Sequence, residues 1–142
     1  MKRIISITFA IIILATAYTA GAQQSSAQVV IANIPFAFTA NSKTLPAGKY
    51  TITVLNSSSD RKALQIRSMN GRFSAMVLTN TVIGSISDNA KLVFERYDDR
   101  YFFAQAQLPG DSTTLAALRS NKERKHAVAT AKKKSVVVIL AE

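Results

Sequence analysis

The stretch from Ala90 to Gly110 reads AKLVFERYDDRYFFAQAQLPG, and its pattern decides the fold of the chain. Apolar and polar side chains alternate on both sides of two central aspartates, most clearly from Phe102 to Leu108. Alternation with aromatic residues is typical of a half-buried strand, and aspartates between two such runs favour a tight turn. The stretch therefore predicts two antiparallel strands joined by a hairpin.

The same period of two marks earlier segments, which begin near Val30, Tyr50 and Leu64. Pro and Gly residues separate these segments, and Asn70-Gly71 is a strong hairpin signal because both residues tolerate positive φ. Pro109-Gly110 ends the series. Turns at intervals of about 10 residues predict a mainly β domain, an antiparallel sandwich or barrel of about seven strands.

The pattern changes in the C-terminal part of the chain. Ser120 to Glu123 has the S-x-x-E form of a capping box, which predicts one helix from about Ser120 to Lys134. The run from Ser135 to Ala141, SVVVILA, is apolar and β-branched. It predicts a last strand that is either buried on both faces or tucked into the sheet.

Residues 1–22 have the pattern of a secretory signal peptide. Two basic residues precede an apolar run, and Ala20-Gly21-Ala22 is the small-residue motif that signal peptidase accepts. Cleavage there would leave one domain, residues 23–142, in the periplasm or outside the cell, with no transmembrane segment. The alternative is a retained membrane anchor, because the apolar run has about 17 residues, the lower limit for crossing a bilayer.

Composition restricts the chemistry that the chain can perform. There is no cysteine, which excludes disulfides, zinc–thiolate sites and cysteine nucleophiles. The net charge of +10 is concentrated in one segment, because Arg119–Lys134 holds seven basic side chains and a single acid, Glu123. A local field of this kind affects association rather than fold.

The basic segment is the first candidate binding site. We expect it to contact an anionic partner, which would be an anionic lipid, an acidic polysaccharide or an extracellular nucleic acid. The alternative is a solvated helix face that keeps an exported protein soluble. The candidate ligand-binding residues are Arg119, Lys122, Arg124, Lys125, Lys132, Lys133 and Lys134.

Three aromatic residues are further candidates. By the alternation, Tyr97, Tyr101 and Phe103 lie opposite Phe94 and Phe102, on the face that we expect to be less buried. Exposed rings on a β surface can stack on sugars or bases. The alternative is that these rings pack in the core.

The sequence offers no residue set for catalysis, metal binding or a cofactor. Glu95, Asp98 and Asp99 are the best place to look for paired carboxylates, but two of them fall at the predicted turn and arginines flank them. His126 is the one histidine, and it lies in a basic run that suggests no orienting partner. The chain has no serine-nucleophile elbow, phosphate loop or zinc-protease motif, so we expect a protein that is not an enzyme.

A set of short motifs occurs in a fixed order along the chain. They are Asn33-Ile34-Pro35-Phe36-x-Phe38, Leu45-Pro46-Ala47-Gly48-x-Tyr50, Lys91-Leu92-Val93-Phe94, Arg96-Tyr97, Tyr101-Phe102 and Leu108-Pro109-Gly110. In this combination the chain resembles a group of small, signal-bearing exported proteins of unknown function that are numerous in acidobacteria. The resemblance covers roughly Val30 to His126. It implies export and an all-β fold, and it implies no catalytic or ligand-binding residues.

Three functional hypotheses follow. The first is an exported, non-enzymatic binding or interaction domain of unknown ligand, with the basic segment as its contact. The second is a small-ligand carrier or hydrolase that uses a barrel interior near Glu95, Tyr97 and Arg100. The third is a structural envelope protein that self-associates by strand addition through Val136–Leu140.

Overall fold

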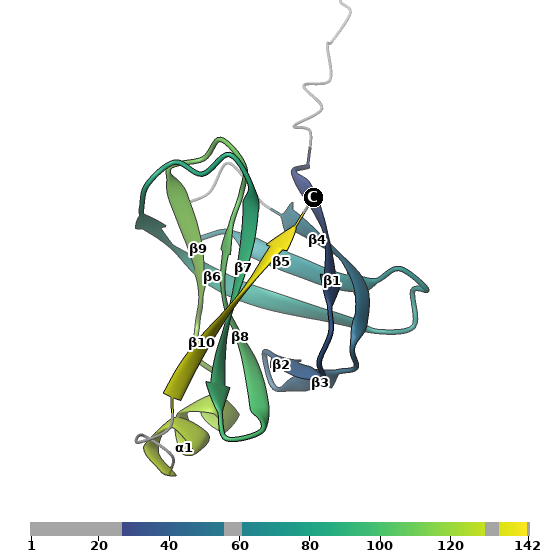
Figure 1. Cartoon of the computed structure of the whole chain (residues 1–142), viewed down its shortest axis with the longest axis vertical. Helices are drawn as coiled ribbons and strands as arrows, with labels where there is room; N and C mark the ends of the chain where they lie inside the picture. Colours follow the sequence, from purple (N-terminus) through teal and green to yellow (C-terminus); the bar gives the residue numbers. More distant parts are fainter. Residues whose placement is uncertain (1–26, 56–60, 130–133, 142) are drawn as a thin grey trace, which may run out of the picture.

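The computed structural model describes residues 27–55, 61–129 and 134–141, and these form ten strands and one helix (Figure 1). The elements are β1 (Val29–Ile34), β2 (Phe38–Ala40), β3 (Lys43–Leu45), β4 (Gly48–Leu55), β5 (Ala63–Ser68), β6 (Ser74–Ile83), β7 (Ala90–Tyr97), β8 (Arg100–Gln107), β9 (Thr113–Ala117), α1 (Asn121–Ala129) and β10 (Lys134–Ala141). The mainly β class with one helix before a last strand is confirmed, although there are ten strands and not about seven. The predicted signal peptide lies outside the described residues.

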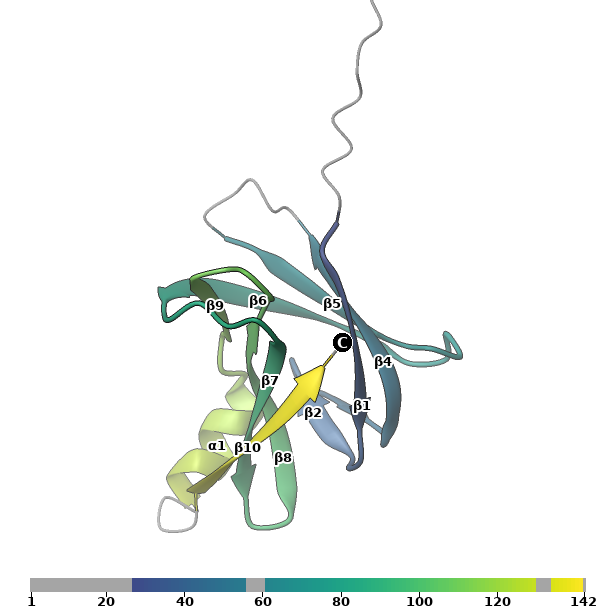
Figure 2. The same ribbon diagram turned by 45° about the horizontal axis from the view of Figure 1, so that its top comes forward.

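The strands belong to one sheet that folds over on itself into two layers, like a sandwich or an open barrel (Figure 2). Hydrogen-bonded neighbours follow the order β1-β4-β5-β6-β9-β8, and β7 and β10 continue from β8. β6 connects the layers, because its first half pairs with β5 and its second half with β9. β1 and β10 are the ends of this path, and no ladder of hydrogen bonds joins them in the described parts of the chain, so the sheet is not closed.

The strands missing from the sequence prediction are mostly short. β2 and β3 have three residues each, too few to show a period of two. They form a hairpin whose first strand runs parallel to β8, with Phe38 opposite Tyr101, an exception to the predicted antiparallel arrangement. Pro35 separates β1 from β2, because proline has no N–H to donate to a ladder.

The core lies between the two layers. Every second side chain of β1 points into the core. Val30 and Ala32 are paired with Ile52 and Tyr50 of β4, which are also buried. Phe38 contacts Tyr50 and Phe94 edge to face, and Phe94 contacts Phe103 in the same way. The Tyr50 hydroxyl donates to the Pro46 carbonyl at 2.6 Å, so the one polar atom of this aromatic group has a partner.

The two predicted hairpins are confirmed. Tyr97 pairs with Arg100 across the turn between β7 and β8, and Asp98 takes a positive φ of 53°, which aspartate tolerates better than most residues. Gly71 takes a φ of 72° in the longer turn between β5 and β6. The residue types at these turns are therefore the ones that the backbone requires.

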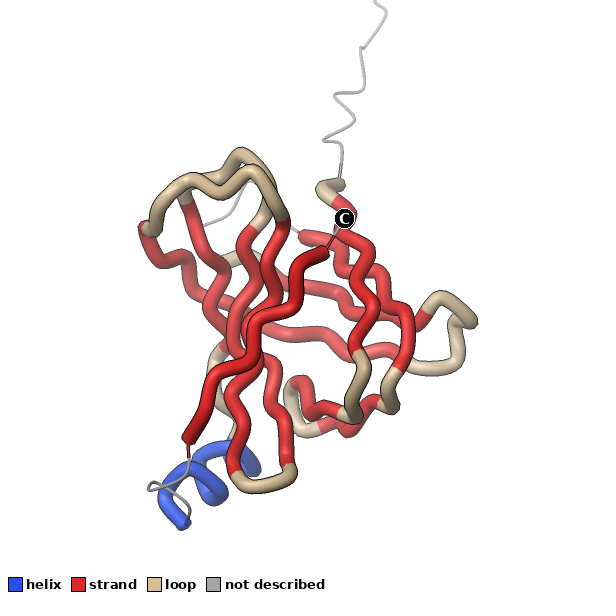
Figure 3. The backbone as a smooth tube through the Cα atoms, viewed as in Figure 1, coloured by secondary structure: helices blue, strands red, loops and turns tan. Residues whose placement is uncertain are grey.

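The helix begins where the capping box predicted. The Ser120 hydroxyl accepts the Glu123 backbone N–H at 3.2 Å, and α1 starts at Asn121. Lys134 already belongs to β10, so the prediction that the helix runs to about Lys134 is wrong. Figure 3 shows the helix at one end of the molecule, beside the start of β10 and the β7–β8 turn. No helix in the described residues is long and apolar enough to span a bilayer.

The predicted last strand is confirmed, but its burial on both faces is wrong. β10 pairs with β7 alone and forms an edge of the sheet. Val136, Val138 and Leu140 are 58%, 52% and 65% exposed, whereas the alternate residues Val137 and Ile139 are half-buried against the core. An edge strand with an uncovered outer face buries only every second side chain.

Candidate functional site

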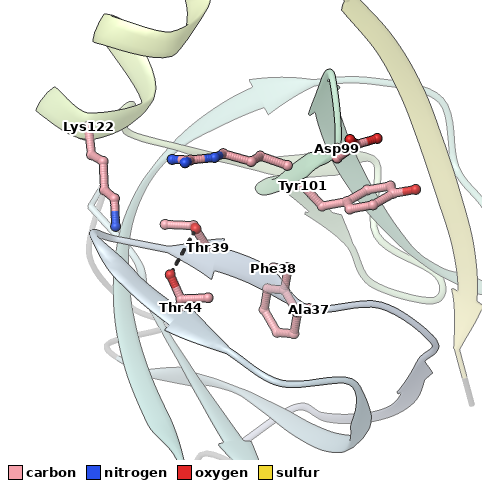
Figure 4. A pocket seen from close by; sticks show the side chains of 8 residues that line it. Ala37, Phe38, Thr39, Thr44, Asp99, Tyr101 and Lys122 are labelled. Atoms are coloured by element: carbon pink, nitrogen blue, oxygen red, sulfur yellow. Dashed lines mark hydrogen bonds between the residues drawn. The ribbon is translucent and has the colours of Figure 1, made fainter.

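A hollow opens between the β2–β3 hairpin, the β7–β8 turn and the start of α1 (Figure 4). Its volume is about 340 Å³. The residues that line it are Ala37, Phe38, Thr39, Thr44, Asp99, Arg100, Tyr101 and Lys122. The polar side chains among them are two cations, three hydroxyl residues and the carboxylate of Asp99 at the rim. The cations and hydroxyls can donate to the oxygens of an anion.

Each polar group of the hollow comes from a different element. Lys122 extends from the first turn of α1 toward the β2–β3 hairpin, as Figure 4 shows. Thr39 and Thr44 face each other across that hairpin with their hydroxyl oxygens 3.4 Å apart. Arg100 is the first residue of β8, directly after the β7–β8 turn. The polar groups of the hollow therefore come from three parts of the chain: the β2–β3 hairpin, the start of β8 and α1.

His126 of α1 fixes the position of Arg100. The guanidinium Nη1 of Arg100 lies 2.8 Å from Nε2 of His126, and the imidazole packs against the Phe102 ring with centroids 5.8 Å apart. Arginine only donates, so this contact is a hydrogen bond in the tautomer whose Nε2 accepts. His126 therefore has a partner on β8 that the basic run around it did not indicate.

The acidic residues near the turn do not form a paired carboxylate site. Asp99 lies at the rim of the hollow, almost fully exposed, with Nη2 of Arg96 at 3.5 Å from its carboxylate. Arg96 also donates to the Asp98 carbonyl at 2.6 Å, so these groups stabilise the turn. Glu95 binds a different set of partners. Among the residues that the structure describes, no group of three or more His, Asp or Glu could hold a metal ion.

The outer face of α1 carries only basic charge. Lys122, Arg124 and Lys125 are exposed, and Arg124 bonds only to Asn121 of its own helix, at 3.1 Å. Glu123, the one acid of the helix, is 5% exposed and faces the sheet, where its carboxylate lies 3.8 Å from Nε of Arg119. The helix therefore presents three cations to solvent without an acid between them.

Two of the predicted basic residues are held by an ionic cluster around Glu95. The Glu95 carboxylate accepts from Lys134 Nζ at 2.8 Å, from Arg119 Nη2 at 3.2 Å and from the Tyr97 hydroxyl at 2.5 Å. Arg119 and Lys134 thus tie both ends of the helical segment to β7, and less of their charge is free for a ligand. Lys132 and Lys133 lie outside the described residues.

The same cluster shifts the pKa values of its acidic groups in opposite directions. Burial would raise the pKa of Glu95, but hydrogen bonds from Lys134 and Tyr97 and the charge of Arg119 lower it overall. Burial and the charge of Glu95 raise the pKa of the Glu123 carboxyl. Burial, with the hydrogen bond to Glu95, raises the pKa of Tyr97 to about 12. Tyr97 therefore stays a hydrogen-bond donor at any physiological pH.

The predicted exposure of the three aromatic candidates is wrong. Phe103 is buried in the core against Phe94, and Tyr101 is half-buried with its ring stacked 3.9 Å from that of Phe36. Tyr97 lies on the other face of the sheet with Phe102, and both are buried because α1 and Arg119 cover that face. Of the three, only Tyr101 also reaches the hollow.

The interior offers the carrier hypothesis no support. Phe38, Tyr50 and Phe94 fill the space between the layers, each less than 2% exposed. Glu95 and Tyr97, which that hypothesis placed near a cavity, point to the opposite face of β7 from Phe94 and are held by ion pairs and hydrogen bonds.

Sequence reasoning missed part of the site. Thr39 and Thr44 belong to strands too short to be predicted, and nothing in their local sequence marks them as ligand-binding. Sequence reasoning placed Arg100 beside the hairpin and near a hypothetical barrel interior, but did not connect it with the basic segment. One sequence feature indicated that Glu95 could neutralise nearby cations: it is the single acid in a strand whose other charged residues are basic.

Comparison of the chain with protein-family models, with curated protein sequences and with solved structures finds no match in any of the three.

Proposed function

We propose that the protein is an exported, non-enzymatic binding domain that contacts an anionic polymer or envelope component. The contact surface is the outer face of α1 together with the adjacent hollow. One observation carries the proposal: Glu123 is turned toward the sheet, which leaves Lys122, Arg124 and Lys125 exposed with no acid among them. A helix that served solubility alone would gain from mixed charges on that face.

The hollow adds a place for a single anionic group beside this face. Arg100 is held by His126 with other guanidinium N–H groups free to donate, and the hydroxyls of Thr39 and Thr44 lie in the same lining. Each cation near an anionic surface contributes about 1 kcal/mol, so a few together give weak, salt-sensitive binding. Such binding suits a repetitive polymer or surface better than a small molecule.

The place of action is part of the same proposal. The signal-peptide pattern of residues 1–22 and the resemblance to small exported proteins of acidobacteria support a location in the periplasm or outside the cell. Anionic lipids, acidic polysaccharides and released nucleic acid all occur there.

Co-sedimentation of residues 23–142 with anionic liposomes, peptidoglycan and DNA, at low and high salt, tests the proposal. We expect salt-sensitive binding that is lost when Lys122, Arg124 and Lys125 are changed to Gln. The matched control changes Lys49, Arg67 and Arg72 to Gln, which removes the same charge at exposed positions on and after β4 and β5. Equal loss in both variants, or no binding by the unchanged protein, would contradict a site on α1.

A single change separates the hollow from the helix face. Arg100→Gln removes the cation that His126 orients, and it leaves the three helix cations in place. We expect weaker binding of ligands with terminal phosphate or carboxylate groups. If binding is unchanged, the helix face alone is the contact.

A further inference from the structure

An exposed apolar patch lies on the outer face of the two strands at the open seam of the sheet. β10 contributes Val136, Val138 and Leu140, and β1 contributes Val29 and Ile31, which are 53% and 41% exposed. The C-terminal end of β10 lies beside β1 in both views of the ribbon (Figures 1 and 2). We call these five residues the seam patch. Contiguous apolar surface of this kind marks an interaction site more often than scattered apolar residues do.

The seam patch and the basic face of α1 belong to the same side of the molecule. Val136 is in register with Glu95, whose side chain lies on the outer face of β7 with Tyr97, and α1 covers that same face at the Tyr97 end. Moving along β10 away from the helix, the outer face passes from cationic side chains to apolar ones. The two surfaces are therefore consecutive, not opposed.

The charges around the seam patch select its occupant. Lys134 begins the apolar row, and Lys91 is the residue opposite Leu140 on β7. Glu95, a described acid on the same outer face of β7, is already neutralised by Arg119 and Lys134. A second copy of this strongly basic chain would bring like charges together at Lys134 and Lys91. A lipid surface, with anionic headgroups over an acyl layer, complements both the cations and the apolar row.

We propose that the anionic partner is a lipid bilayer, with the seam patch inserted at the boundary of headgroups and acyl chains and α1 in contact with the headgroups. This inference rests on the proposed function and narrows its partner. A single apolar row or a single basic helix gives only marginal membrane binding, and two signals together give stable binding. Binding accordingly requires both anionic lipid and the apolar side chains.

The absence of tryptophan from the chain permits a direct test. Leu140→Trp places one fluorophore in the seam patch, and Leu78→Trp places one at a similarly exposed leucine on the outer face of β6, 57% against 65% exposed. With anionic phosphatidylglycerol vesicles we expect a blue shift and quenching by brominated lipid for Leu140→Trp, and neither for Leu78→Trp. Equal shifts at both positions, or none at position 140 while the protein sediments with vesicles, would overturn the assignment to the seam patch.

A second pair of variants separates this inference from the proposed function. Changing Val136, Val138 and Leu140 to Gln should lower partition onto anionic vesicles by about tenfold or more, because buried apolar area is lost. The same variant should bind DNA or peptidoglycan as the unchanged protein does, since α1 is intact. If vesicle binding is unaffected, the bilayer inference falls and the proposed function stands.

Two further outcomes would also count against the inference. Binding to DNA or peptidoglycan with none to anionic vesicles would leave the proposed function and remove the bilayer. A monomer–dimer equilibrium without vesicles that the triple Gln variant abolishes would assign the seam patch to a second copy of the chain.

Discussion

The body of the sheet, β1 to β9, and the C-terminal unit, α1 with β10, are stabilised by different interactions. In the body, aromatic and aliphatic side chains such as Phe94 and Ile52 are completely buried between the layers. In the C-terminal unit, the side chains that β10 turns inward are only partly buried, and Glu95 ties the unit to β7 through Arg119 and Lys134. Apolar burial is nearly independent of pH and salt, whereas ion pairs are not. The fold therefore depends mainly on the body, whereas the stability of the C-terminal unit depends on pH and salt.

Truncation in the body should have the largest effect. Phe94→Ala removes a ring that contacts Phe36, Phe38 and Phe103, and we expect a loss of about 3–5 kcal/mol in the free energy of unfolding. Urea denaturation followed by circular dichroism measures it. Phe73→Ala, at a ring 41% exposed, is the control and should cost about 0.5 kcal/mol or less. Equal costs would contradict the role of Phe94 as a fully buried contact between the layers.

Glu95→Gln should loosen the C-terminal unit and leave the body intact. It removes the charge that Arg119, Lys134 and Tyr97 share, and we expect a cost of about 1–2 kcal/mol, reduced because both cations are partly exposed. Amide hydrogen exchange measured by residue should accelerate in β10 and α1 but not in β4 and β5.

Asp99→Asn is the matched control for that change. Asp99 carries the same charge on the same hairpin, but its side chain is 99% exposed. Its exchange pattern should equal that of the unchanged protein. Faster exchange in β4 after Glu95→Gln would show that the unit and the body unfold together.

The pH dependence of the unit should have two limbs of opposite sign and a smaller amplitude. The folded pKa of Glu123 lies above its ordinary value of 4.5, so its contribution to stability is complete below that value and is lost as pH rises through the folded pKa. The folded pKa of Glu95 lies below 4.5, so its contribution is complete above that value and is lost as pH falls through the folded pKa. Stability should therefore rise as the pH falls from neutral toward 4.5, and decrease below it.

Glu123→Gln tests which carboxyl is responsible for the rising limb. The variant should show no gain in stability between neutral pH and 4.5, and it should keep the loss at lower pH. Urea midpoints across this pH range are the measurement. A rising limb that persists in Glu123→Gln would assign it to another group.

The smallest effect on stability should come from the helix face. Changing Lys122, Arg124 and Lys125 to Gln alters exposed side chains that have no ion-pair partner among the described residues, and we expect a change within about 0.5 kcal/mol. Urea denaturation checks this on the same variant used for co-sedimentation. A stable variant that has lost its ligand separates binding from folding, whereas a large destabilisation would show that the cations support the unit.

The sequence allowed the body to be predicted in outline because its signals are local. The aspartates of the β7–β8 turn and the Ser120 cap act within a few residues of their own position, and both are confirmed. The alternation of apolar and polar residues can likewise be recognised within a single strand. The strand count was too low because β2 and β3 are short, and because exposed apolar residues such as Met76 and Leu78 hide the alternation of β6.

The candidate site was harder to predict because it depends on pairings between distant residues. Alternation correctly placed Tyr97 opposite Phe94, but it assigned Phe102 to the core face and Phe103 to the outer face, which is wrong because the β7–β8 register shifts after Val93. Nor can alternation show that a helix covers the outer face. Counting charges made Arg119 and Lys134 look free, while Glu95 binds both from 24 and 39 residues away. The helix cations Lys122, Arg124 and Lys125 were predicted correctly as exposed.

The separation in sequence between β7 and its partner β10 affects the order of assembly. β4, β5 and β6 pair with their neighbours in sequence and need only short loops to close. β7 gains its second neighbour only when β10 pairs with it. Lys134 of β10, which binds Glu95 of β7, follows Glu95 by 39 residues in the sequence. A chain that emerges from its N-terminus thus exposes one edge of β7 until β10 has been synthesised. That interval is when a neighbouring chain competes most effectively with the native strand.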